Sequence, residues 1–205
     1  KPNIEYLMKK FYLILVISFL TGSLFWSCKK EKDKRVLIFS KTLGYRHKSI
    51  PVARDMLLEK LAAEGIKADT TENSAYFITD SLQKYSAVIF LMTSGDVLDY
   101  RQQAHFQRYI QAGGGYVGVH SAVDTEYKWP WYNKLAGAYF SHHPQQQEAE
   151  IEVIDSTHIA TKHLPTRWRR FDEWYDFKDY NDDVNVLALL DEDTYEGGQH
   201  GDFHP

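Results

Sequence analysis

Continuous apolar runs alternate with amphipathic stretches between residues 35 and 120. Four of these runs predict strands, at residues 35–40, 66–70, 87–92 and 116–120. The strand at 66–70 is expected to be more exposed than the other three. Unbroken apolar runs are typical of parallel strands that are covered on both faces. Periodic apolar positions predict helices at 50–64 and 99–112. Strands that alternate with helices indicate a mostly parallel, doubly wound α/β sheet.

The ends of the predicted helices carry the usual signals. Pro51 fits the first turn of the helix at 50–64, and Gly65 follows its last turn. The glycine run that begins at Gly113 stops the helix at 99–112. The segment between residues 73 and 82 has no clear period, and we expect it to be irregular.

The pattern is less regular after residue 120. Trp129–Tyr132 is expected in a loop or short helix, and residues 148–155 alternate as in an edge or antiparallel strand. Residues 184–190 predict one more apolar strand. Residues 168–177 are aromatic and charged, and residues 197–205 are rich in turn formers.

The first 34 residues read as a targeting segment and a tether. A basic start at Lys9 and Lys10 precedes the apolar run 11–20, which is short for a membrane span and typical of a secretory signal. Cys28 closes this segment as in a bacterial lipobox, so residues 1–28 predict a signal peptide with Cys28 lipidated. Residues 29–34 are then a charged tether. A lipid-anchored protein of the cell envelope is expected, periplasmic or at the outer membrane; the alternative is a single N-terminal anchor helix.

Composition removes several functions. Cys28 is the only cysteine, so the domain has no disulfide, no CxxC metal site and no catalytic thiol. A net charge of −4 without a basic stripe argues against nucleic acid as a partner. Aromatic residues make up 15% of the chain and gather with His, Asp and Glu in the second half. This favours a pocket for a sugar or another flat ligand, although aromatic side chains also pack well in any core.

One stretch, Gly113–Asp124, combines three glycines, a short apolar strand and then His120. Ligands of open α/β folds bind outside the carboxyl ends of the strands. A sharp turn after a strand can present one reactive side chain, and here that side chain is His120. Its ordinary pKa suits acid/base work, and imidazole also ligates metals. Asp124, Glu126 and Tyr127 follow closely and are expected to line the same mouth.

Other candidates lie in three further segments. His47 and Arg46 lie in the loop after the first strand, where Arg46 could hold an anionic or hydroxyl-rich ligand. His142 and His143 are adjacent, so at most one is expected to face a site, and His142 is a candidate metal ligand. Glu173 lies between Asp172 and the aromatic pair Trp174–Tyr175, where a carboxyl group can have a raised pKa.

Four motifs together resemble one family. They are Gly44-Tyr-Arg-His47, Gly118-Val-His-Ser-Ala122, the segment from Leu135-Ala-Gly-Ala138 to His142-His-Pro144, and Asp172-Glu-Trp-Tyr175. The chain from residue 35 to 205 is similar to the ThuA-like, trehalose-utilisation domains. That resemblance implies a flavodoxin-like three-layer sandwich related in fold to class I glutamine amidotransferases. The family continues beyond a His-Pro like His204-Pro205, so the domain is expected to be truncated at Pro205.

His120 stands where the amidotransferases have their cysteine, so glutaminase chemistry is not expected. The resemblance implies carbohydrate catabolism, with a trehalose-like sugar or another glucoside as the small-molecule partner. We expect acid/base hydrolysis or isomerisation of a sugar or keto-sugar, with His120 and Glu173 as the catalytic pair. The expected substrate-binding residues share a polar or aromatic side chain: Arg46, His47, Asp124, Trp131 and Tyr175.

Two questions stay open at the level of sequence. A divalent metal such as Zn2+ could take part, with His120 or His142 as a ligand. A sugar-binding lipoprotein without catalysis is the alternative function. It would keep the aromatic pocket but would not need His120 and Glu173 to titrate near neutrality.

Overall fold

The computed structural model describes residues 34–205. The predicted signal segment 1–28, with Cys28, and the tether as far as Asp33 lie outside the described residues. Among residues 34–205, no helix has the length and hydropathy needed to cross a membrane.

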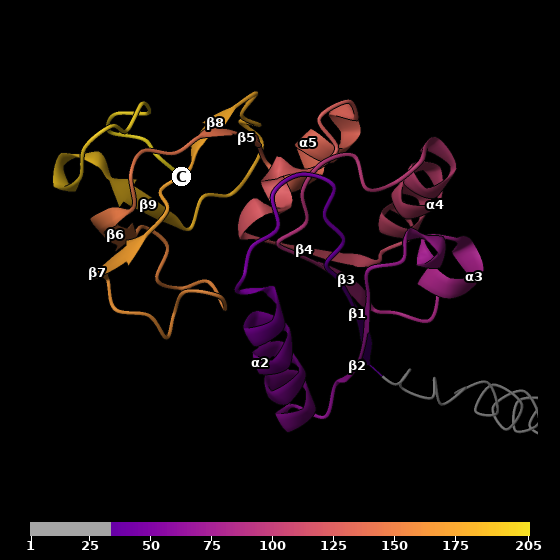
Figure 1. The fold of residues 1–205 in the computed structure, drawn as a ribbon. Coiled ribbons are helices and arrows are strands. Elements are labelled where there is room, and N and C mark those ends of the chain that lie inside the picture. Colours follow the sequence, from indigo (N-terminus) through magenta and orange to yellow (C-terminus); the bar gives the residue numbers. More distant parts are fainter. Residues whose placement is uncertain (1–33) are drawn as a thin grey trace, which may run out of the picture. The chain divides into compact units, whose positions relative to one another are not determined.

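A four-stranded parallel sheet forms the centre of the domain (Figure 1). Its strands are β1 (Arg35–Phe39), β2 (Lys67–Thr71), β3 (Ala87–Leu91) and β4 (Gly115–Val119). Their order is β2-β1-β3-β4, so the chain reverses its direction across the sheet after β2. This order places a topological switch point between β1 and β3, at the edge where the strands end.

Helices cover both faces of this sheet. α2 (Ile50–Ala63) lies on one face, and α3 (Thr79–Leu82), α4 (Tyr100–Gln111) and α5 (Pro130–Ala136) lie toward the other (Figure 1). Asp99 caps α4 through a capping box with Gln102, which satisfies amide groups that the first turn leaves free. The result is the three-layer, flavodoxin-like sandwich that the sequence predicts.

The two faces of β1 carry separate cores because successive side chains of a strand point to opposite sides. Leu37 and Phe39 pack with Phe106 of α4 and Tyr132 of α5. Val36 and Ile38 pack with the apolar side of α2. All four β1 side chains are nearly inaccessible to water. The sheet edge is thereby held rigidly between two packed layers.

The second half of the domain adds two small antiparallel sheets. β5 (Tyr139–His142) pairs with β8 (Asp176–Lys178), while β6 (Gln147–Val153) pairs with both β7 (Arg167–Asp172) and β9 (Ala188–Asp191). Within residues 34–205, three 3-10 turns complete the element order: η2 (Ser74–Tyr76), η3 (His120–Asp124) and η4 (Glu192–Thr194).

Most predicted elements are confirmed, and two differ. The strand expected at 184–190 begins only at Ala188, because the carbonyl of Leu187 accepts hydrogen bonds from Ile154 and Asp155, where the chain leaves β6. The segment 73–82, expected to be irregular, holds η2 and α3. Asn73 accepts a hydrogen bond from the amide of Ala75, a local cap that apolar periodicity does not show.

Candidate functional site

His120 stands at a sharp turn directly after β4. Its φ angle is 53°, in the left-handed region, whereas Val119 is extended. That conformation costs roughly 1–2 kcal/mol for a residue with a Cβ. Strain of this kind is often kept where a side chain must be aimed at a site. The turn presents the imidazole at the carboxyl edge of the sheet, as the sequence predicts.

Three other side chains meet His120 there. His47 comes from the loop after β1, and its ring centroid lies 4.4 Å from that of His120. Glu173 and Tyr175 come from the segment between β7 and β8, far along the chain. Glu173 Oε2 lies 3.3 Å from His120 Nε2. The structure therefore gathers both predicted catalytic residues with two of the predicted binding residues.

The hydroxyl of Tyr175 lies at the centre of this group. It is 2.9 Å from His120 Nε2, 3.5 Å from His47 Nε2 and 3.3 Å from Glu173 Oε2. One phenolic proton faces three atoms that can accept it. A small change in the position of Tyr175 or its neighbours therefore decides whether its hydroxyl donates to His120, His47 or Glu173.

Burial sets the protonation of the group. Burial and the neighbouring His47 lower the pKa of His120, against the opposing effect of Glu173. Burial alone would raise the pKa of Glu173, but a hydrogen bond from Gln146 and the nearby histidines lower it overall. Burial and Glu173 raise the pKa of Tyr175. Near neutral pH the site thus holds a neutral imidazole, a carboxylate and a protonated phenol.

A cavity of about 370 Å³ opens beside His120, Glu173 and Tyr175. Its remaining walls are mainly apolar and include Trp174, Phe177, Leu189 and Leu190. Cavities of this size with a few polar groups are typical of sites for small organic ligands. The polar end of the cavity is the cluster around His120.

The other predicted binding residues have different surroundings. The guanidinium of Arg46 pairs with Glu72 at 2.7 Å, on the exposed side of the loop. Asp124 accepts a hydrogen bond of 2.6 Å from the hydroxyl of Tyr127. Its negative charge also helps to raise the pKa of Tyr175, after the larger effects of burial and Glu173. Trp131 stacks on Trp129 at 5.0 Å and packs against the core. Among the residues that the structure describes, no contact joins Arg46 or Trp131 to the cluster, and their binding roles stay predictions.

The histidine pair divides between two places, as its spacing predicts. The ring of His143 lies 5.7 Å from that of Tyr175 and nearly parallel to it. His142 Nε2 instead lies 3.3 Å from Asp176 Oδ2. His142, the predicted metal ligand, therefore belongs to a second group of side chains.

Among residues 34–205, two sets of side chains have donor atoms close enough for one metal ion. In each set the donor atoms lie within 4.8 Å of one another: His47, His120 and Glu173, and Asp176, His200 and His204. In the first set the Tyr175 hydroxyl already occupies the middle, which favours proton transfer. The second set was missed in the sequence analysis. Its signal is the spacing of His200 and His204, a His-x3-His pattern typical of metal ligands.

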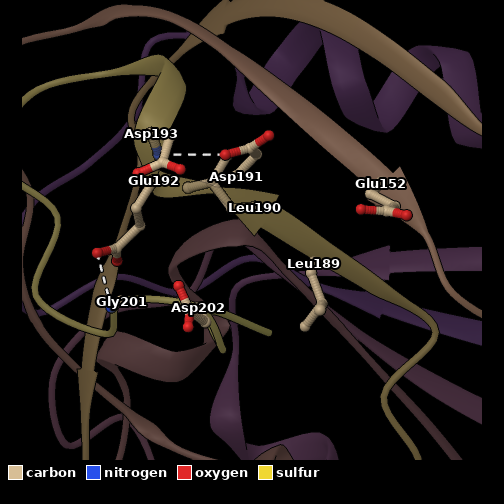
Figure 2. Close-up of a pocket in the computed structure, with 8 residues that line it drawn as sticks. All are labelled: Glu152, Leu189, Leu190, Asp191, Glu192, Asp193, Gly201 and Asp202. Atoms are coloured by element: carbon tan, nitrogen blue, oxygen red, sulfur yellow. Dashed lines mark hydrogen bonds between the residues drawn. The ribbon is translucent and has the colours of Figure 1, made fainter.

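An acidic pocket of about 380 Å³ lies against η4 and β9 (Figure 2). Carboxylates of Asp191, Asp193 and Asp202 line it, together with Glu192, whose Oε2 accepts a hydrogen bond from the amide of Gly201. Figure 2 shows Glu192 reaching from η4 toward Gly201. No basic side chain lines the pocket, but Arg167 beside it pairs with Glu152 and Asp191, so the remaining carboxylates carry its attraction for a cation.

The layered parallel sheet and the strained histidine at its carboxyl edge define a flavodoxin-like α/β protein. The model of one family, described as trehalose utilisation, matches residues 35–205. The chain belongs to this ThuA family.

Two crystal structures have the same fold as this chain. A ThuA-like protein from Bacteroides uniformis is 26% identical, with a TM-score of 0.70 over 84% of this chain and 74% of the other. A ThuA-like protein from Parabacteroides merdae is 21% identical, with a TM-score of 0.65 over 78% of this chain and 68% of the other, and shows the shared fold. No curated protein is similar enough to count as a match.

Proposed function

We propose that this ThuA-family protein carries out acid/base hydrolysis or isomerisation of a sugar or keto-sugar, with trehalose-like and other glucosides as the first substrates to test. The observation that supports it best is the Tyr175 hydroxyl among His120, His47 and Glu173. General acid/base catalysis needs a base and an acid within hydrogen-bond reach of one reacting group. This cluster supplies both at the end of a cavity of suitable size.

Each residue has a distinct role in this proposal. Neutral His120 is the general base, because burial lowers its pKa. Its Nε2 accepts a proton from water or a sugar hydroxyl once the Tyr175 hydroxyl, now 2.9 Å away, turns to the substrate. Tyr175, whose raised pKa keeps it protonated in the resting site, is the general acid: it gives its proton to a sugar oxygen, and the imidazolium that forms on His120 returns a proton to the phenolate. Glu173 remains a carboxylate and stabilises the imidazolium that forms on His120. The apolar wall of the cavity excludes water and strengthens these interactions.

The test is turnover of trehalose, other glucosides and their keto derivatives, followed by the release or conversion of sugar. His120→Gln should lower kcat by roughly 10²–10⁴-fold, which is the usual contribution of a general base. His105→Gln is the matched control, because His105 on α4 contacts Thr79 and Arg108 and no part of the cluster. Equal turnover of the two variants would show that His120 does not carry the chemistry.

The second candidate is a sugar-binding protein without catalysis. The apolar and aromatic cavity wall favours it, since aromatic side chains pack against sugar rings. It predicts a thermal shift with sugar in both wild type and His120→Gln, and no product with either. Binding at a hundred times the dissociation constant adds about 2.7 kcal/mol of stability, which a melting curve resolves.

The place of action is proposed from the sequence alone. The apolar run 11–20 followed by Cys28 supports export and attachment to the cell envelope by a lipid on Cys28. Expression of the full chain in a bacterium with labelled fatty acid should label the wild type and leave Cys28→Ser unlabelled. Label on both proteins, or on neither, would contradict lipidation at Cys28.

A further inference from the structure

Asp176, the first residue of β8, buries a carboxylate that lacks a complete set of partners. Its residue exposure is 1%. Oδ1 accepts a hydrogen bond from the amide of Gln199, whereas Oδ2 is buried and has no hydrogen-bond partner among the described residues. Buried charges in proteins are paired or coordinate metal ions, because an isolated ionised group is strongly disfavoured there. Asp176 therefore needs a positive charge nearby.

The nearest histidines do not supply that charge in this arrangement. His200 Nε2, 3.7 Å from Asp176 Oδ1, accepts a hydrogen bond of 2.9 Å from the amide of Phe177. An amide nitrogen can only donate, so this imidazole nitrogen carries no proton and its single lone pair receives the Phe177 N–H. His142 Nε2 faces the side-chain amide of Gln199 at 3.0 Å in the same way. Neither nitrogen therefore donates a proton to the carboxylate, and an ion bound at Asp176 would take the lone pair of His200 in place of the Phe177 amide.

His204 completes the group from the same loop as His200. The two rings have centroids 4.6 Å apart. His204 is 2% exposed, and its Nδ1 lies 2.7 Å from Glu192 Oε1. A metal-ligating histidine usually holds its other ring nitrogen against a carboxylate in this way, which fixes the ring and raises its basicity. Glu192 is itself fixed by the amides of His200 and Gly201.

We propose that Asp176, His200 and His204 bind a divalent transition-metal ion of the Zn2+ type, and that Glu192 positions His204 for it. The donor atoms lie within 4.8 Å of one another. Nitrogen and carboxylate donors select Zn2+ and similar ions over Ca2+, which takes oxygen ligands. His204 Nε2 donates a hydrogen bond of 2.8 Å to the carbonyl of Tyr175. To ligate the ion it would release that proton to solvent and turn from the oxygen, because a ligating imidazole nitrogen is unprotonated.

The surroundings fit the approach of a cation. The acidic pocket of Figure 2 includes Glu192 in its lining, and Oε1 of Glu192 faces His204, so the pocket adjoins the proposed site through this residue. A cleft lined by one sign of charge raises the local concentration of the opposite ion. The site adjoins the proposed chemistry at His120, because His204 also lines that cavity, but it uses different donor residues and its test needs no turnover.

The experiment is equilibrium dialysis of the full chain against Zn2+, with the bound metal measured by elemental analysis. Wild type should retain a zinc ion that His200→Ala and Asp176→Asn lose. Glu192→Gln should bind it roughly 10–100-fold more weakly, as expected for a residue that holds a ligand from behind. His163→Ala removes an exposed histidine outside the site and should bind as the wild type does.

His47→Ala separates this site from the other group of donor atoms. It should keep the ion if Asp176, His200 and His204 hold it, and lose it if the ion lies at His120 and Glu173. Circular dichroism without metal shows which variants fold, and the affinity of Glu192→Gln tests the site if Asp176→Asn does not fold. Failure of the wild type to retain zinc, or retention by His200→Ala at wild-type affinity, overturns the proposal.

Discussion

The Tyr175 hydroxyl lies 2.9 Å from Nε2 of His120, although 55 positions separate the two residues in the chain. Two independent parts of the fold make this contact. His120 is fixed by the strained turn after β4, and Tyr175 by the short strand β8 that follows it. The sheet edge and the antiparallel second half must therefore both be formed before the proposed acid and base meet.

Tyr175→Phe tests this contact directly. The substitution keeps the ring but removes the proton donor, so turnover should fall by roughly 100-fold or more. The free energy of unfolding should change by only about 1 kcal/mol, the usual net value of one hydrogen bond. Tyr76→Phe, at a half-exposed tyrosine of η2, is the control for the loss of a hydroxyl. Turnover that survives Tyr175→Phe would remove the phenol from the mechanism.

His120 should make both stability and activity depend on pH. Its pKa in the folded protein is lowered by burial and by His47, below the ordinary 6.5. The unfolded chain therefore binds a proton first as the pH falls, and folding stability is lost from about 6.5 down through the folded-state pKa. Urea unfolding between pH 7.5 and about 5 should show a smaller loss for His120→Gln than for wild type.

The same pKa gives the acidic limit of turnover. A base that must be neutral stops working when it is protonated, so the profile of kcat against pH should fall on the acidic side with a midpoint below 6.5. A midpoint above 6.5 would mean that His120 is protonated more easily than its burial allows, and would assign the limiting group to another residue.

Gly118, in β4 just before the turn at His120, lets the side chains of Tyr116 and Ala122 approach the backbone closely. A Cβ at this position would lie 2.6 Å from the hydroxyl oxygen of Tyr116 and 3.2 Å from Cβ of Ala122. Gly118→Ala should therefore cost about 1–3 kcal/mol of stability, as overpacking usually does. The matched test is the double variant Gly118→Ala with Tyr116→Phe, which removes the clashing oxygen. Recovery of stability in thermal melts of that double variant would assign the cost to the contact with the Tyr116 hydroxyl. A double variant as unstable as Gly118→Ala would show that the cost has another source.

The fold and the two histidines of the site, His47 and His120, could be predicted because each depends on a short stretch of neighbouring residues. Unbroken apolar runs mark β1 and β3, and a histidine directly after a strand marks His120. His47 follows for the same reason, since loops after parallel strands share an edge. The pairing of Asp176 with His142 depends on the register of β5 and β8, which no periodicity of the sequence encodes.

Glu126 shows where local reasoning gives the wrong surroundings. Its position six residues after His120 places it at the mouth of the site by sequence, but the structure buries it at 1% exposure. The side chain turns toward α4, where Oε1 accepts a hydrogen bond from the amide of Leu98 and Oε2 one from Gln103. The carboxylate of Glu126 thereby links the segment after η3 to the start of α4. Its role is structural, and the prediction that Glu126 lines the mouth is wrong.

Glu126→Gln should consequently change stability in a pH-dependent way without disturbing the cluster at His120. Burial raises the pKa of Glu126 in the folded protein, and the hydrogen bonds from Leu98 and Gln103 only partly oppose this. The folded state then binds a proton more tightly than the unfolded chain. Wild-type stability should therefore fall as the pH rises from the ordinary glutamate range through the folded-state pKa. The Gln variant keeps an oxygen for the amide of Leu98, meets Gln103 through its NH2 group once the Gln103 amide turns its own oxygen inward, and has no charge to bury.

Urea unfolding of wild type and Glu126→Gln at pH 4.5 and at pH 8 measures this difference. The free energy of unfolding of Glu126→Gln relative to wild type should increase as the pH rises. Glu64→Gln, at an exposed position after α2, should have the stability of the wild type at both pH values. A Gln variant that loses stability relative to wild type at high pH would show that the carboxylate is favoured in its site. The hydrogen bonds to Leu98 and Gln103 would then outweigh the burial of its charge.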